Sequence, residues 1–134
     1  MKHRDIKNID KSNDSYFEND SVIGVLSDDL KENILVGSFV IIPKSQVEIP
    51  FDMTEKEWLD TKEMMTTIKE YIDKEYKPDG YNIGWNIGSV GGQNIIHAHL
   101  HIIPRYKDEP YAGKGIRYWF KQEENKRECF KDKC

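Results

Sequence analysis

Three histidines at every second position constrain the fold of this chain more than any other feature. His97, His99 and His101 alternate with apolar residues in the run HAHLHI. Successive side chains of a strand point to opposite faces, so a strand would place all three imidazoles on one face and the apolar residues on the other. A helix would scatter the rings, because residues two apart do not share a helix face. The spacing therefore predicts a strand that presents three of the chain's four histidines to a ligand.

Two kinds of chemistry are compatible with this pattern. A lone histidine on a strand is usually an ordinary surface or core residue, but packing does not explain strict alternation of three. A His-x-His pair could offer two nitrogens to zinc, although Asp108 and Glu109 lie beyond Pro104 and no cysteine is close. The other possibility is nucleophilic catalysis at phosphorus, for which a neutral imidazole with a pKa of about 6.5 is competent. A second ring could then donate to phosphate oxygens while a third orients the nucleophile.

The residues around the histidines carry a family resemblance. The run HAHLHII at residues 97–103, Asn86, the Gly-Gly-Gln turn at residues 91–93 and the Ile-Pro-Arg tail at residues 103–105 resemble the histidine triad signature. That family contains nucleotide hydrolases and transferases, and this chain is most similar to its bacterial, diadenosine polyphosphate hydrolase-like branch. The resemblance implies an α+β fold, in which an antiparallel sheet of about five strands has one long helix on one face and the histidines on the other. It also implies a homodimer.

The same resemblance implies a mechanism and a set of site residues. The middle histidine, His99, would attack the α-phosphate of a nucleoside polyphosphate or phosphoramidate and form a covalent nucleotidyl-histidine, which water hydrolyses. His101 would donate to the non-bridging oxygens, and His97 would orient and polarise the site. The protein itself would require no metal or other cofactor, although magnesium could accompany a polyphosphate substrate. The residues expected to bind the nucleotide are Asn86, Gly92, Gln93, Asn94, Asp28 and Asp29.

Two positions depart from the family pattern. The family has a histidine where this chain has Ser38, and another after the Pro-Lys pair where this chain has Gln46. These departures leave an alternative open, which is a nucleotide-binding sensor or scaffold with little catalytic activity.

Periodicity predicts the elements that flank the triad. Apolar residues at 22–26 and 34–42, separated by a polar turn, indicate an antiparallel hairpin. Residues 54–76 have helical periodicity, and Thr54 with Glu57 three positions later forms a capping box. The apolar stripe of this helix, which includes Trp58 and Leu59, is expected to pack on the sheet face opposite the histidines. Residues 81–87 alternate as a strand, with Asn82, Gly84 and Asn86 expected on the histidine face.

Composition bounds the remaining expectations. At 134 residues the chain is expected to form one domain, with a polar N-terminal arm at 1–15, the triad domain at 16–120 and a charged helix or tail at 121–134. A net charge of −4 gives no basic field for nucleic acid, and no apolar stretch is long enough to span a membrane. The chain shows no secretory signal, and its two cysteines are expected to be free thiols of a cytoplasmic protein.

The segment 111–120 combines basic, aromatic and glycine residues. It is either a flap whose Lys114 and Arg117 meet the distal phosphates of a substrate, or a surface loop that leads to a packed aromatic segment.

Overall fold

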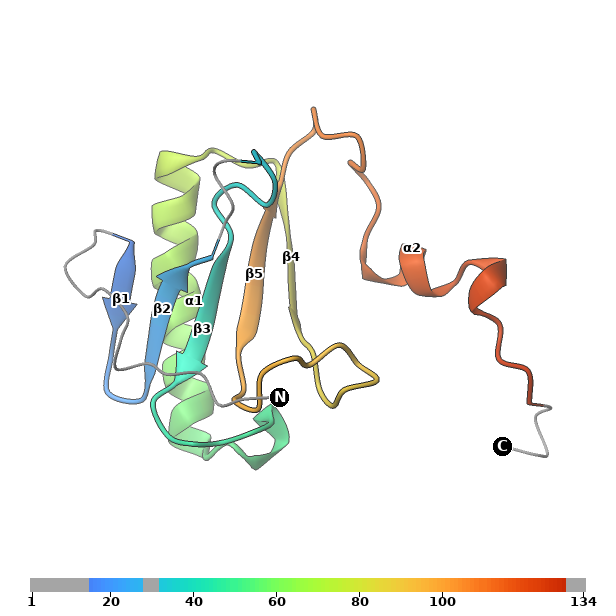
Figure 1. The fold of residues 1–134 in the computed structure, drawn as a ribbon. Helices are drawn as coiled ribbons and strands as arrows, with labels where there is room; N and C mark the ends of the chain where they lie inside the picture. The colour runs from blue at the N-terminus through green and yellow to red at the C-terminus, as the bar shows by residue number, and fades with distance from the viewer. Residues whose placement is uncertain (1–14, 28–31, 130–134) are drawn as a thin grey trace.

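The computed structural model describes residues 15–27 and 32–129, which form an antiparallel sheet with one long helix on one face (Figure 1). The strand order is β1-β2-β3-β5-β4, so β1 and β4 are the edges. The predicted α+β class is therefore confirmed. The elements in chain order are β1 (Tyr16–Glu18), β2 (Val22–Leu26), β3 (Phe39–Pro43), η2 (Pro50–Asp52), α1 (Glu55–Glu75), β4 (Gly80–Trp85), β5 (Leu100–Arg105), α2 (Ile116–Phe120) and η3 (Glu123–Asn125).

The predicted hairpin is present, but its second strand begins later than the apolar pattern suggested. β2 pairs with β3 along its whole length, from Val22 opposite Pro43 to Leu26 opposite Phe39. The residues before Phe39 form a turn instead of a strand. Asn33 and Leu35 have φ angles of 55° and 54°, in the left-handed region that a strand does not use. An apolar run is therefore necessary for a strand but does not fix where the strand starts.

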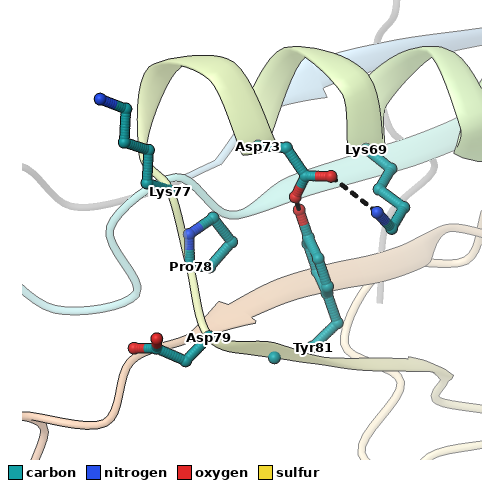
Figure 2. A pocket seen from close by; sticks show the side chains of 7 residues that line it. Lys69, Asp73, Lys77, Pro78, Asp79 and Tyr81 are labelled. Carbon is teal, nitrogen blue, oxygen red and sulfur yellow. Dashed lines mark hydrogen bonds and ion pairs between the residues drawn. The ribbon is translucent and has the colours of Figure 1, made fainter.

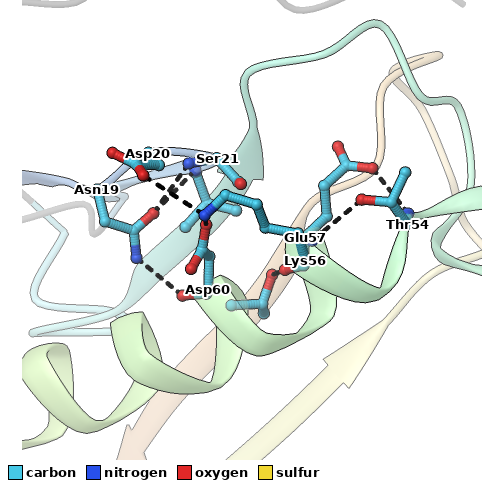
Figure 3. Close-up of polar contacts among 9 residues, drawn as sticks. Asn19, Asp20, Ser21, Thr54, Lys56, Glu57 and Asp60 are labelled. Carbon is cyan, nitrogen blue, oxygen red and sulfur yellow. Dashed lines mark hydrogen bonds and ion pairs between the residues drawn. The ribbon is translucent and has the colours of Figure 1, made fainter.

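Helix α1 begins as its sequence predicts. The hydroxyl of Thr54 accepts a hydrogen bond from the Glu57 backbone N–H at 3.1 Å, and the Glu57 carboxylate accepts one from the Thr54 N–H at 2.8 Å (Figure 3). Ser45 also donates to this carboxylate, at 2.6 Å. Burial raises the pKa of Glu57, but the hydrogen bonds from Ser45 and Thr54 outweigh it and hold the pKa below its ordinary value. The cap therefore favours the ionised carboxylate.

The sheet has a core on each face. The core beneath α1 is the larger, and at its centre the side chain of Ile68 lies over β2 at Gly24, where an added Cβ would come within 2.5 Å of Ile68 Cδ1. A glycine there lets the helix approach the sheet closely. The opposite face has a smaller buried group of β-branched residues, Ile23, Val25, Val40 and Ile42.

One part of the predicted helix stripe is wrong. Trp58 and Leu59 are 43% and 60% exposed, although both belong to the apolar periodicity that was expected to pack on the sheet. The positions buried in α1 are Glu57, Thr61, Met64, Ile68 and Ile72. The buried stripe of the helix is narrower than its apolar stripe because the helix packs on β2 and β3. Trp58 lies at the edge of the buried stripe, where its ring meets the Trp85 ring edge to face with centroids 5.8 Å apart.

Polar contacts fix both ends of α1 against the sheet. Near its start, the Asn19 amide donates to the Asp60 carbonyl oxygen at 2.9 Å (Figure 3). Near its end, Asp73 accepts hydrogen bonds from the Tyr81 hydroxyl and from Lys69, each at 2.6 Å (Figure 2). Burial, followed by the contact with Asp73, raises the pKa of Tyr81. These contacts attach the helix to the turn between β1 and β2 and to β4.

Two further expectations meet the structure here. No helix in the described part of the chain is long and apolar enough to cross a membrane. The expectation of free thiols is wrong for Cys129, which is disulfide-bonded. The sequence gives the position of a cysteine but not its oxidation state. Cys134 and residues 1–14 lie outside the described residues, so the proposed N-terminal arm stays a prediction.

Candidate active site

The third histidine of the triad lies on a strand, as predicted. His101 belongs to β5, opposite Val40 of β3 and Gly84 of β4. Paired residues of an antiparallel sheet share a face, and Val40 belongs to the core on the side away from α1. His101 therefore points away from the helix, and Gly84 leaves space beside it on the edge strand. This confirms the predicted placement of Gly84 on the histidine face.

The first two histidines precede the strand, which corrects the expectation of one continuous histidine strand. β5 begins at Leu100, whereas His97 lies in a bend and Ala98 and His99 have no regular secondary structure. The Ala98 N–H donates to the carbonyl oxygen of Val47 at 3.0 Å, so this segment takes its partner from the connection before α1. Alternation alone could not show where the strand begins, because the pattern of residue types is the same on both sides of Leu100.

The His97 ring is fully buried and donates a hydrogen bond to the backbone of β3. Its Nε2 lies 2.8 Å from the carbonyl oxygen of Pro43, at the end of β3. A carbonyl oxygen only accepts, so Nε2 carries the proton in this contact. The ring thereby links the triad segment to the neighbouring strand. Complete burial keeps the His97 ring out of contact with solvent.

The His99 ring is oriented by a hydrogen bond to the backbone. Its Nδ1 lies 2.8 Å from the carbonyl oxygen of His97, so Nδ1 donates and the neutral ring keeps its lone pair on Nε2. The ring is half-buried and meets the His101 ring edge to face, with centroids 4.9 Å apart. One imidazole therefore has a fixed tautomer and orientation, and a second lies against it.

The turn before the triad is shaped by glycine and held by Gln93. Gly92 has a φ of 96°, and a Cβ at Gly91 would come within 2.4 Å of a backbone oxygen. The Gln93 side chain is buried and makes three hydrogen bonds to the backbone. Its oxygen accepts from the Gly88 N–H at 2.9 Å, and its amide nitrogen donates to the carbonyls of Glu48 at 2.8 Å and Ile95 at 3.0 Å. Gln93 thus joins the turn to the connection before α1.

The other predicted substrate-binding residues are placed differently from one another. Asn86 is exposed just beyond the end of β4, and its side-chain amide lies 3.6–3.9 Å from the position of a Cβ on Gly92. The structure therefore brings Asn86 and Gly92 together. Asn94 is exposed, and among the described residues its side chain forms no hydrogen bond. Asp28 and Asp29 lie outside the described residues, so their role stays a prediction.

The two departures from the family pattern also differ in environment. Ser38 is buried immediately before β3, and its hydroxyl has no hydrogen-bond partner within the described chain. Gln46 is exposed in the connection between β3 and α1.

Sequence reasoning missed the importance of Arg105, which it treated only as the end of the Ile-Pro-Arg tail. The guanidinium donates to the side chains of Asn82 and Glu109, and to the carbonyl oxygens of Lys114 at 2.9 Å and Tyr111 at 2.7 Å. The only signal in the sequence was an arginine alternating with the triad. Its partners become apparent only when the chain folds back on β5.

Two other features of the described chain bear on where a ligand could bind. Within residues 15–27 and 32–129, no group of three His, Cys, Asp or Glu side chains is arranged to hold a metal ion. The hollow near Lys69, Asp73 and Tyr81 lies beside the end of α1, on the sheet face opposite His101 (Figure 2). Lys69, Asp73 and Tyr81 bond one another there, and the hollow contains no histidine.

A comparison with family models matches residues 17–108 to the HIT domain. The chain is 31% identical over 99 residues to a Bacillus subtilis protein named Protein hit, covering 74% of this chain and 62% of that protein. It is 35% identical over 74 residues to the Schizosaccharomyces pombe asymmetrical bis(5'-nucleosyl)-tetraphosphatase, covering 55% and 41%. The chain therefore spans less than two thirds of the length of these relatives.

Solved structures give the same result. A HIT family protein from Bacillus anthracis superposes with a TM-score of 0.61 at 30% identity, covering 70% of this chain and 65% of that one. A Plasmodium falciparum diadenosine triphosphate hydrolase superposes with a TM-score of 0.62 at 22% identity, covering 75% and 66%, and at that identity supports the fold alone.

Proposed function

This chain belongs to the HIT domain family, and we propose that it is a nucleotide hydrolase or nucleotidyl transferase that acts through His99. The observation that carries the proposal is the hydrogen bond from His99 Nδ1 to the His97 carbonyl oxygen. That bond leaves the Nε2 lone pair of the neutral ring as the nucleophile. Relatives whose names describe hydrolysis of dinucleoside polyphosphates support this class of reaction.

The proposed reaction has two displacements at one phosphorus. His99 Nε2 attacks the α-phosphorus, a P–N bond forms, and the bond from phosphorus to the leaving group breaks. A nucleoside polyphosphate leaves as an anion, whereas an amine leaving group takes a proton from water. Water then attacks the nucleotidyl-histidine, the P–N bond breaks, and a nucleoside monophosphate is released while the water's remaining proton passes to solvent.

Neighbouring groups have supporting roles in this proposal. His101, whose ring lies against His99, donates to the non-bridging oxygens as negative charge develops. His97 holds the segment by its bond to Pro43 and presents the carbonyl that orients His99. The glycine turn, with Asn86 beside Gly92, allows a phosphate to approach the backbone closely. Substrates with the required α-phosphate are dinucleoside polyphosphates, nucleoside phosphoramidates and aminoacyl-adenylates.

Ser38 favours a second candidate function. In the described part of the chain, the buried Ser38 hydroxyl has no hydrogen-bond partner, and Ser38 stands where the family has a histidine, immediately before the strand β3 that pairs with β5. A site weakened in this way would bind nucleotides and turn them over slowly, as a sensor or scaffold does.

One experiment distinguishes the two functions. Wild type and His99→Ala are mixed with the three substrate classes, and the products of a rapid alkaline quench are analysed by mass spectrometry. The enzyme proposal expects one added nucleotidyl mass on the peptide carrying residues 97–101, and loss of both adduct and turnover in His99→Ala. Turnover of His99→Ala within about tenfold of wild type would contradict the nucleophile assignment. Nucleotide binding by wild type without any adduct would favour the sensor.

We also propose a homodimer. The edge strand β4 and the margin of α1 expose an apolar group, in which Trp58 is 43% and Ile83 40% exposed. Such residues beside an unpaired edge strand suit a two-fold contact. Light scattering at micromolar concentration is expected to give twice the chain mass, and a monomer throughout would contradict the dimer.

A further inference from the structure

The segment that follows β5 has an unusual composition. Residues 111–121, called the C-terminal arm below, read YAGKGIRYWFK and contain three cations, four aromatic rings and no acidic side chain. The cations are Lys114, Arg117 and Lys121, and within the described residues none of them forms an ion pair. The arm stands beside the edge strand β4 (Figure 1), and no residue of its helix α2 is buried. Its charges and rings are therefore available to a ligand.

Arg105 attaches the arm to the sheet. Its guanidinium donates to the carbonyl oxygens of Tyr111 and Lys114, and also to the side chain of Asn82 on β4. A rigid planar group that bonds several partners at once fixes their relative positions. The base of the arm is thus held to β5, which carries His101, and to the neighbouring strand β4.

The arm also reaches the histidine face directly. Ile116 Cδ1 lies 3.9 Å from the position of a Cβ on Gly84, and Gly84 is opposite His101 in the pairing of β4 with β5. A Cβ on Gly84 would point to the same face as the His101 side chain. Ile116 is therefore one strand away from the triad, on the side where a substrate would lie.

The centre of the arm combines a cation with exposed rings. The Lys114 ammonium stands 5.3 Å from the ring centroid of Tyr111, 5.0 Å from that of Tyr118 and 6.0 Å from that of Trp119. A cation–π contact orients an ammonium while its N–H donors remain able to meet a phosphate. Tyr111 and Trp119 are 58% and 46% exposed, and exposed aromatic rings are platforms on which nucleobases stack.

We propose that the C-terminal arm is a second subsite, which binds the distal phosphates and the second nucleoside of a dinucleoside polyphosphate. Lys114 and Arg117 pair with the phosphates, the exposed ring of Trp119 stacks on the base, and Arg105 positions the arm. This inference rests on the proposed function, and it assigns dinucleoside polyphosphates as the preferred substrate class. A nucleoside phosphoramidate has nothing to place in this subsite.

Binding measurements on His99→Ala protein test the arm independently of turnover. Calorimetry gives the dissociation constants of diadenosine tetraphosphate and of AMP, and their ratio measures what the arm contributes. Arg117→Gln removes an exposed charge without touching the ring cluster, and Trp119→Leu removes a stacking platform. Lys74→Gln removes the same charge from an exposed position on α1 and is the control.

The expected result is a preference for the dinucleotide that falls about tenfold in Arg117→Gln, the low end for a hydrogen bond to a charged group at an exposed site. Trp119→Leu is expected to lower it at least fivefold, and Lys74→Gln less than twofold. Equal affinity for the two ligands in the parent, or an unchanged ratio in both arm variants, overturns the inference. A dinucleotide preference in a wild type that never hydrolyses the ligand would refute the proposed function while the arm subsite stands.

Discussion

Replacing Gln93 by Met gives the sharpest test of how the site is held. The side chain keeps its length but loses the oxygen that accepts from Gly88 and the nitrogen that donates to Glu48 and Ile95. We expect Gln93→Met to destabilise the protein, because three backbone groups lose a partner at once. A residue whose main task is to bind phosphate would instead weaken substrate binding and leave stability unchanged.

The size of the effect follows from burial. A net contribution of about 0.5–1.5 kcal/mol for each hydrogen bond gives a total between about 1.5 and 4.5 kcal/mol. Gly88 and Glu48 are exposed and Ile95 is half-buried, so water can replace part of what the Gln93 amide supplied. The lower part of the range applies, and we expect the free energy of unfolding to fall by about 2 kcal/mol.

The assay is urea unfolding followed by tryptophan fluorescence, at one fixed protein concentration because a dimer's stability depends on it. With an m-value of about 2 kcal/mol/M, the midpoint should fall by about 1 M. Asn94→Ala, next in sequence and exposed, is the matched control and should change the free energy of unfolding by no more than about 0.5 kcal/mol. A Gln93→Met midpoint within about 0.2 M of wild type would refute the reasoning.

Three further predictions concern the scaffold. Gly24→Val should lower the free energy of unfolding by about 1–3 kcal/mol, because the new side chain meets Ile68 beneath α1; an unchanged melting temperature would contradict this. Thr54→Ala should cost about 1 kcal/mol in urea unfolding by removing the helix cap, and Thr54→Ser should recover most of it. The pKa of Glu57 is lower in the folded protein than its unfolded value near 4.5. The stabilisation by the ionised carboxylate is therefore present above the unfolded pKa and is lost as pH falls through the folded pKa. Glu57→Gln should lose less stability than wild type between about pH 7 and pH 4, and an equal loss in urea unfolding would exclude a stabilising role of the ionised carboxylate.

Local sequence was enough for features whose cause is local. The capping box of Thr54 and Glu57 needs only residues three apart, and the structure confirms it. The alternation of Asn82 and Gly84 in β4 predicted their face, because successive strand residues always point to opposite sides. The triad spacing and its frame were also enough to indicate the family, which the match over residues 17–108 confirms.

Local patterns failed where a distant part of the chain decides the outcome. Residues 34–38 have the apolar character of a strand, but left-handed residues there place them in a turn. Trp58 has the helical spacing of a core residue, yet it lies beyond the strands that α1 covers. Periodicity reports which residues share a face, and it does not report how wide the opposing surface is.

The sequence by itself determined that three histidines, a glycine turn and a long helix belong to one α+β unit, because each of these features is recognised from residues spaced one to four positions apart. Only the tertiary structure decided how the rings of the triad are held. The bond from His97 to Pro43 joins residues 54 positions apart and fixes the triad segment against β3. The bond from His99 Nδ1 to the His97 carbonyl oxygen gives the neutral His99 ring the tautomer whose lone pair is on Nε2. A hydrogen bond depends on distance and direction between atoms, and the order of residues along a chain contains neither.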